Sequence, residues 1–214
     1  MEAPGSGDEE AESGGEAGGD YTIGFSISTL NNPFFVTLSE GAEAKAEELG
    51  ATVSVVDAQD DAAKQASDVE DLIQQGVDLI MINPVDSEAV AAAVESANAA
   101  NIPVITVDRS ASGGEVVSHI ASDNVAGGEM AGELLVSLVG EGAKVAELEG
   151  VPGSSAANER GEGFNNVAEG QLDIVAKQTA NFNRGEGLTV MENILQSNPD
   201  ITGVFAHNDE MALG

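Results

Sequence analysis

The feature that most constrains this fold is a regular alternation of short apolar segments with longer helical ones, starting at Tyr21. Segments such as VDLIMIN and IPVITVD are almost continuous apolar runs, which is typical of strands covered on both faces of a sheet. Strands separated by helices of this length predict βαβ units and parallel sheets. The expected strands are residues 21–28, 52–58, 77–83, 102–108, 116–122, 143–150, 172–178 and 201–207.

Helices are expected between these strands. Pro33 stands near the first turn of the first helix and Gly50 stops it, while Asp86 or Ser87 is expected to cap an Ala-rich helix that runs to about Ala99. The other expected helices are residues 61–75, 124–139, 154–169, 186–197 and one that begins at Asp209. About four units fall on each side of residue 122. The fold class is therefore α/β, with two Rossmann-like lobes at 21–122 and 123–214.

Composition excludes several classes of function. There are 38 acidic residues against 7 basic ones, a net charge of −31, which repels nucleic acid and anionic membranes. We interpret this surface as an adaptation to high salt, with a cation-binding surface as the alternative. The absence of cysteine excludes disulfides, thiol catalysis and zinc–thiolate sites. No segment has the roughly 18 consecutive apolar residues of a membrane helix, and no signal peptide is visible.

Residues 1–20 form a separate region, in which seven residues are acidic, six are glycine and none is basic. This composition predicts a disordered acidic tether. Its use as a spacer between a membrane anchor and the first lobe is a further expectation.

Ligands of open α/β sheets bind beyond the carboxyl ends of the strands, so the residues that follow each strand are the candidates. We take eight polar or aromatic residues among them as ligand contacts: Asn32, Phe34, Phe35, Asp108, Arg109, Arg160, Phe182 and Asn208. Only three arginines occur in the chain, and two lie at or near these strand ends. Carboxylate, guanidinium and amide groups hydrogen-bond hydroxyls, and phenyl rings stack on the apolar side of a sugar ring. The set predicts a site for a small, neutral polyhydroxyl ligand.

Each candidate also has a structural alternative. Asp108 and Arg109 could form an ion pair, and Arg160 could pair with a neighbouring glutamate, Glu159 or Glu162. Asn32 and Asn208 could act as helix caps. The three phenylalanines could be ordinary packing residues, and His207 is expected to be a partly buried residue.

Several longer motifs resemble the ribose-binding proteins of bacterial ABC importers. They are STLNNPFF (28–35), INPVDSEAV (82–90), ANIPVITVDR (100–109), GEVVSHIASDN (114–124), SAANERGEGF (155–164) and VFAHNDEMALG (204–214). The resemblance runs from about Thr22 to the last residue. It implies two lobes joined by a hinge, with a sugar, D-ribose or a related pentose or hexose, held in the cleft between them.

The same resemblance implies roles for the candidates. The Asn, Asp and Arg residues among the eight would hydrogen-bond the sugar, and the three Phe residues would pack against its ring. The family chain continues beyond MALG, so we expect an incomplete second lobe and a fragment or an early-ended product. The implied protein is a monomer that is extracellular or periplasmic, delivers its sugar to an ABC permease in the membrane, and uses no metal or cofactor.

Two rival functions are weaker. The ligand domain of a sugar-responsive transcription repressor shares this fold, but it predicts an N-terminal helix-turn-helix and a basic face, where this chain has an acidic, Gly-rich segment. An enzyme would need a nucleophile, a metal cluster or a cofactor loop at the strand ends. SISTLNNPFF contains no G-x-G-x-x-G, and the two histidines are far apart in sequence, so no catalytic residue is predicted.

Overall fold

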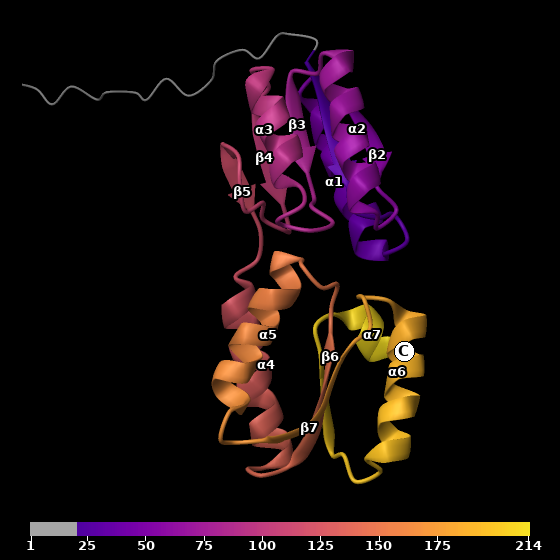
Figure 1. Ribbon diagram of the computed structural model, residues 1–214, viewed down its shortest axis with the longest axis vertical. Helices are drawn as coiled ribbons and strands as arrows, with labels where there is room; N and C mark the ends of the chain where they lie inside the picture. The colour runs from indigo at the N-terminus through magenta and orange to yellow at the C-terminus, as the bar shows by residue number, and fades with distance from the viewer. Residues whose placement is uncertain (1–20) are drawn as a thin grey trace, which may run out of the picture.

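The computed structural model describes residues 21–214, which form two α/β lobes arranged along the long axis of the molecule (Figure 1). The predicted tether, residues 1–20, lies outside the described residues. The first lobe contains β1 (Thr22–Ile27), α1 (Pro33–Glu48), β2 (Thr52–Asp57), α2 (Ala62–Gln75), β3 (Leu79–Ile82), α3 (Ala91–Ala99), β4 (Val104–Val107) and β5 (Ser118–Ile120). The second contains α4 (Asn124–Val139), β6 (Lys144–Glu149), α5 (Ser155–Ala168), β7 (Asp173–Thr179), α6 (Arg184–Ser197), β8 (Gly203–Ala206) and α7 (Asp209–Leu213).

The first lobe is built on a five-stranded parallel sheet with the order β2-β1-β3-β4-β5. Its central strands β1, β3 and β4 are largely buried because helices cover both faces, as their continuous hydrophobicity predicts. Val69 and Leu72 of α2 pack with Val94 of α3 on one face. Phe35 of α1 packs with Phe25 and Ile27 of β1 on the other.

The second lobe is built on a three-stranded parallel sheet with the order β7-β6-β8. Helices α4 and α5 lie on one side of this sheet and α6 and α7 on the other (Figure 1). Phe164 of α5 stacks on Phe205 of β8 with ring centroids 4.3 Å apart, and Ile194 of α6 packs with Leu148 and Met211 on the opposite side. The two parallel sheets with flanking helices confirm the predicted fold class.

One predicted helix start was wrong. Helix α3 begins at Ala91, and its N-cap residue, Val90, makes no side-chain capping bond. Asp86 instead accepts hydrogen bonds from the backbone N–H groups of Glu88 and Ala89, at 2.9 and 2.7 Å, and so closes a turn that precedes the helix. Asp86 therefore organises this turn and does not cap the helix.

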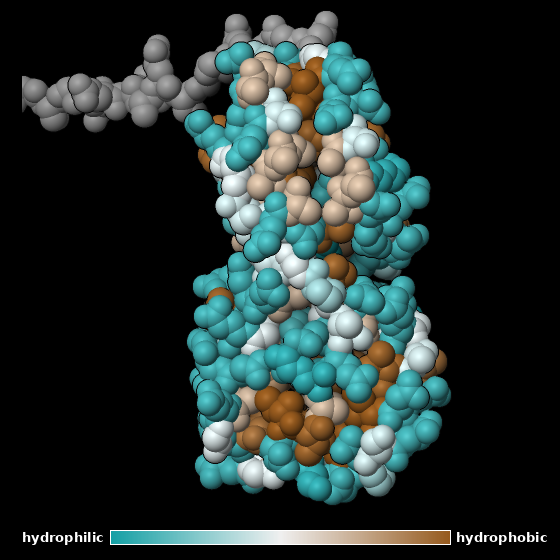
Figure 2. Space-filling model, viewed as in Figure 1, coloured by the Kyte–Doolittle hydropathy of each residue, from teal (hydrophilic) through white to brown (hydrophobic). Residues whose placement is uncertain are grey.

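The carboxyl ends of both sheets face each other across the junction between the lobes. Residues that follow the strands touch there: the Ser87 N–H donates to the Gly153 carbonyl at 3.0 Å, and the Ser110 N–H donates to Oγ of Ser155, the first residue of α5, at 2.9 Å. The chain crosses from lobe to lobe between Ile120 and Asn124, and the boundary at residue 122 stays a prediction. In space-filling view the molecule narrows at this junction, and hydrophilic residues cover most of the visible face (Figure 2). Within residues 21–214, no helix has the length and apolar character needed to cross a membrane.

Candidate functional site

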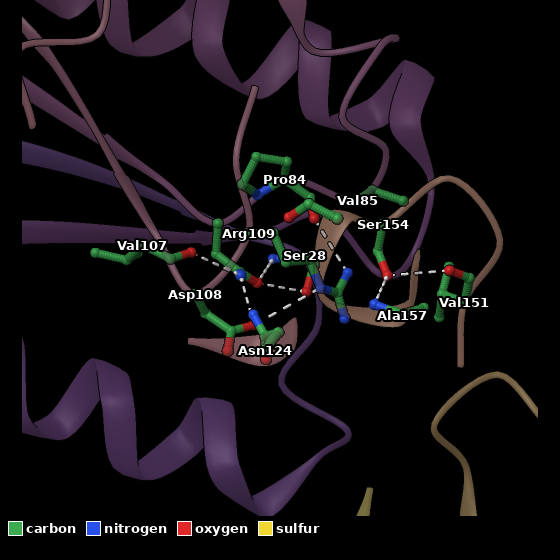
Figure 3. A network of polar contacts seen from close by, with 12 residues as sticks. Ser28, Pro84, Val85, Val107, Asp108, Arg109, Asn124, Val151, Ser154 and Ala157 are labelled. Atoms are coloured by element: carbon green, nitrogen blue, oxygen red, sulfur yellow. Dashed lines mark hydrogen bonds and ion pairs between the residues drawn. The ribbon is translucent and has the colours of Figure 1, made fainter. Parts of the chain in front are cut away.

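The end of β4 places a charged pair at the junction. Asp108 has a φ of 63°, in the left-handed region that few residues other than glycine adopt, and its N–H donates to the Ile120 carbonyl at 2.8 Å. This turn directs Arg109 inward, where only 1% of the residue is exposed. Its Nη1 donates to the Pro84 carbonyl at 3.0 Å, and its Nε lies 3.7 Å from Asp108 Oδ2 (Figure 3). The predicted ion pair is therefore present.

The charges of Asp108 and Arg109 are buried at a cost that their mutual attraction offsets only in part. Burial raises the pKa of Asp108, and the nearby Arg109 and Arg160 charges offset this only in part. Burial likewise lowers the pKa of Arg109, against the opposing effects of Asp108 and Asp60. Among residues 21–214, Arg109 Nε is buried without a hydrogen-bond partner. A buried donor without a partner is costly, so a ligand oxygen placed here would relieve that cost.

A buried polar network under the pair fixes its position. Asn83, at the end of β3, is completely buried and donates to the Val107 carbonyl at 3.0 Å and toward Asp108 Oδ2 at 3.5 Å. Ser28 Oγ, directly after β1, donates to Asn83 Oδ1 at 2.6 Å. Sequence reasoning did not single out Asn83, although an amide directly after an apolar strand was the available signal.

Aromatic rings from both lobes surround the Arg109 guanidinium. Its Cζ lies 5.2 Å from the Phe35 ring centroid and 5.5 Å from that of Phe182, within cation–π range. Phe35 and Phe182 are buried, as the packing alternative proposed. Phe34 is different, since 55% of it is exposed beside the edge of the Phe35 ring.

The two candidate asparagines are both helix caps. Asn32 Oδ1 accepts from the Phe34 N–H at 3.0 Å at the start of α1, and Asn208 Oδ1 accepts from the Met211 N–H at 3.0 Å at the start of α7. Asn208 Nδ2 also donates to the Phe182 carbonyl at 3.1 Å, where Phe182 has a φ of 57°. The capping alternative is thus correct for both residues. It is compatible with ligand contact, because capping uses only the side-chain oxygen.

Arg160 enters the junction from α5, and the suggested pairing with Glu159 or Glu162 was wrong. Its Nε donates to Asn124 Oδ1 at 2.9 Å and its Nη1 donates to the His207 carbonyl at 2.7 Å. Asn124 was missed by sequence reasoning, although its place directly after the junction crossing could have marked it. Glu159 instead accepts from Asn124 Nδ2 at 3.1 Å, and Glu162 lines a separate hollow in the second lobe.

All eight candidates line one cavity of about 760 Å³ between the lobes. The first lobe contributes Asn32, Phe34, Phe35, Asp108 and Arg109, and the second contributes Arg160, Phe182 and Asn208. Asn124 lines the same cavity. Its volume lies within the roughly 300–1,000 Å³ of small-molecule sites. Within residues 21–214, no three His, Asp or Glu side chains are grouped to hold a metal ion. The cavity joins acceptors, fixed cations and phenyl faces, which suits an uncharged polyhydroxyl molecule.

The comparison with known families agrees with this geometry. The family model of the periplasmic binding protein domain matches residues 23–214. The chain belongs to the periplasmic binding protein family. Among curated members, the ribose import binding protein RbsB of Bacillus subtilis is 63% identical over 195 residues, and that of Escherichia coli is 55% identical over 194.

These relatives are longer than this member of the family. The aligned residues make up 91% of this chain and 64% of the Bacillus protein, and 90% and 66% in the Escherichia comparison. A crystal structure of an ABC transporter solute-binding protein from Mycobacterium smegmatis with bound glycerol superposes with a TM-score of 0.87 at 39% identity. That superposition covers 91% of this chain and 68% of the other.

Proposed function

We propose that this chain captures a monosaccharide, D-ribose, in the cavity between its lobes, as a binding protein and not as an enzyme. The observation that carries the proposal is the gathering of eight polar and aromatic residues, distant in sequence, around one cavity. Membership of the periplasmic binding protein family and 63% identity to a protein named for ribose import support it.

Each group of the cavity has a role in this proposal. Arg109 and Arg160 donate to hydroxyl oxygens, and Asp108 accepts from a hydroxyl. The amide nitrogens of Asn32 and Asn208 are further donors, since their oxygens are used in capping. The exposed ring of Phe34 and the buried rings of Phe35 and Phe182 cover the apolar faces of the sugar. Because the chain crosses between the lobes once within residues 21–214, between Ile120 and Asn124, a hinge motion there opens and closes the cavity.

The proposed partner is an ABC permease, which receives the sugar from the closed, monomeric binding protein at the outer face of a membrane. Isothermal titration calorimetry with D-ribose tests the first step. Saturable heat with one site per chain supports the proposal. No heat at millimolar D-ribose, with the chain shown to be folded by circular dichroism, contradicts it.

A further inference from the structure

A buried polar cluster in the second lobe lies directly behind Arg160, outside the ligand contacts assigned above. At its centre is Glu147 of β6, whose side chain is completely buried. His207 Nε2 lies 2.9 Å from Glu147 Oε1, Asn165 Nδ2 lies 3.2 Å from Oε2, and Lys177 Nζ lies 3.3 Å from Oε2. Residues of β6, α5 and β7, together with the end of β8, therefore converge on one carboxylate. A buried carboxylate is expensive to maintain, so an apolar residue would serve simple packing better.

The tautomer of His207 follows from its contacts. The Gly150 N–H donates to His207 Nδ1 at 3.3 Å, so Nδ1 is an acceptor and the ring proton lies on Nε2. That Nε2–H donates to Glu147. Burial by itself raises the pKa of Glu147, but the hydrogen bond from His207 and the charge of Lys177 outweigh it, so the pKa lies below its ordinary value. The imidazole is held at both nitrogens and cannot turn without losing a bond.

The backbone of the same histidine holds the arginine of the cleft. The His207 N–H donates to the Leu148 carbonyl at 3.0 Å, and the His207 carbonyl accepts from Arg160 Nη1 at 2.7 Å. Helix α5 approaches the ring closely next to this contact, since a Cβ at Gly161 would lie 3.1 Å from His207 Cε1 and 3.4 Å from Glu147 Oε1. Gly161, the residue after Arg160, therefore packs directly against His207 and Glu147.

We propose that Glu147 and His207 are positioning residues that hold the Arg160 guanidinium in its orientation for the sugar. Glu147 anchors the imidazole of His207, and the anchored side chain fixes the His207 carbonyl. That carbonyl and Asn124 Oδ1 together fix two of the three nitrogens of Arg160. The third nitrogen is thereby directed to the ligand. This inference rests on the proposed function for its effect on affinity, but the orientation of Arg160 is measurable without sugar.

The chain offers an unusually simple readout, because its only arginines are Arg109, Arg160 and Arg184. A proton–nitrogen NMR spectrum therefore contains three arginine Nε–H signals, and Arg160→Lys assigns one of them. His207 holds the guanidinium at Nη1, so replacing it is expected to loosen the neighbouring bond from the Arg160 Nε–H to Asn124 Oδ1 as well. We therefore expect His207→Leu to speed solvent exchange of the Arg160 Nε–H by about tenfold. Glu149→Gln is the matched control, because Glu149 also contacts Lys177, at 3.3 Å, but makes no hydrogen bond to His207. In this variant the Arg160 Nε–H is expected to exchange at the wild-type rate.

Sugar titration separates positioning from a general structural role. His207→Leu is expected to weaken D-ribose binding about tenfold in the wild-type background and to have no further effect in Arg160→Ala, because the histidine acts through that arginine. Equal effects in both backgrounds, or an unchanged Arg160 exchange rate, overturn the inference. If His207→Leu does not fold, His207→Gln, which reaches only one of the two ring partners, is expected to speed exchange about threefold, and a wild-type rate in that variant overturns the inference. If His207→Leu speeds the exchange but the wild-type chain binds no ribose, the positioning role stands and only the proposed function is refuted.

Discussion

Replacing Arg109 by methionine removes the guanidinium that both lobes share while retaining much of its length. In the structure this group makes a charged hydrogen bond to the Pro84 carbonyl and stacks between Phe35 and Phe182. A hydrogen bond to a charged group contributes about 1.5–3 kcal/mol to stability, and a cation–π contact about 0.5–2 kcal/mol. Methionine keeps part of the apolar contact. We therefore expect a net loss of about 2–3 kcal/mol of unfolding free energy, which lowers the melting temperature by roughly 4–12 °C.

Arg109→Met is also expected to weaken the binding of D-ribose. The variant loses at least one charged hydrogen bond to the sugar and the fixed orientation of two rings, about 3–4 kcal/mol in total, or a factor of roughly 150 to 900 in Kd. Arg109→Lys keeps the charge but not the planar fork, so its affinity is expected to lie between the two. Calorimetry gives Kd, and a thermal melt shows that the variant is folded. A folded Arg109→Met chain that binds D-ribose within threefold of the wild type refutes the reasoning.

Three further predictions concern closure, pH and salt. Gly153 has a φ of 84°, and a Cβ there would collide with the Asp86 carboxylate of the other lobe, so Gly153→Ala is expected to weaken ribose binding about tenfold by calorimetry. The control is Gly140→Ala, which has a φ of 86° but open space around it and is expected to leave Kd unchanged. Burial raises the pKa of Asp108, so between the ordinary and the raised pKa the folded state holds more protons than the unfolded state, and the unfolding free energy falls as pH rises. Ribose affinity is expected to fall in titrations from about pH 7 to pH 4, because the carboxylate becomes protonated. Asp108→Asn, which is uncharged at every pH, should remove that pH dependence. With a net charge of −31, the melting temperature should rise between about 0.1 and 1 M NaCl as the screening length falls from about 10 to 3 Å, and equal melting temperatures would count against the salt-adapted surface.

The strands and helices could be predicted from the sequence because they depend on local patterns. Apolar runs such as TIGFSI and LIMI are largely buried strands, and the first helix begins at Pro33, as its proline predicts. The start of α3 was mispredicted because Asp86 satisfies two N–H groups of a turn, and the helix begins five residues later, at Ala91, where no side-chain cap marks it.

The position of the candidate residues at the junction could be predicted from the sequence, but their hydrogen-bond partners could not, and their contact with a sugar stays a prediction. Strand ends identify which residues reach the junction, and that rule placed all eight candidates at one cavity. It says nothing of partners, which depend on how helices pack. The Arg160 contacts with Asn124 and His207 join residues 36 and 47 positions apart, and the burial of Glu147 beside them follows from α5 lying against β6 and β8. Phe34 and Phe35 are adjacent in sequence, yet one is exposed and the other buried, because the helix turns them to different sides.

The most direct test of the account is a crystal structure of this chain grown with D-ribose. The account predicts one ribose between the lobes, within hydrogen-bond distance of Asp108, Arg109 and Arg160, with phenyl rings against its apolar faces. Ribose bound elsewhere, or bound with these three side chains turned away from it, would contradict the claim that the two lobes form one sugar site.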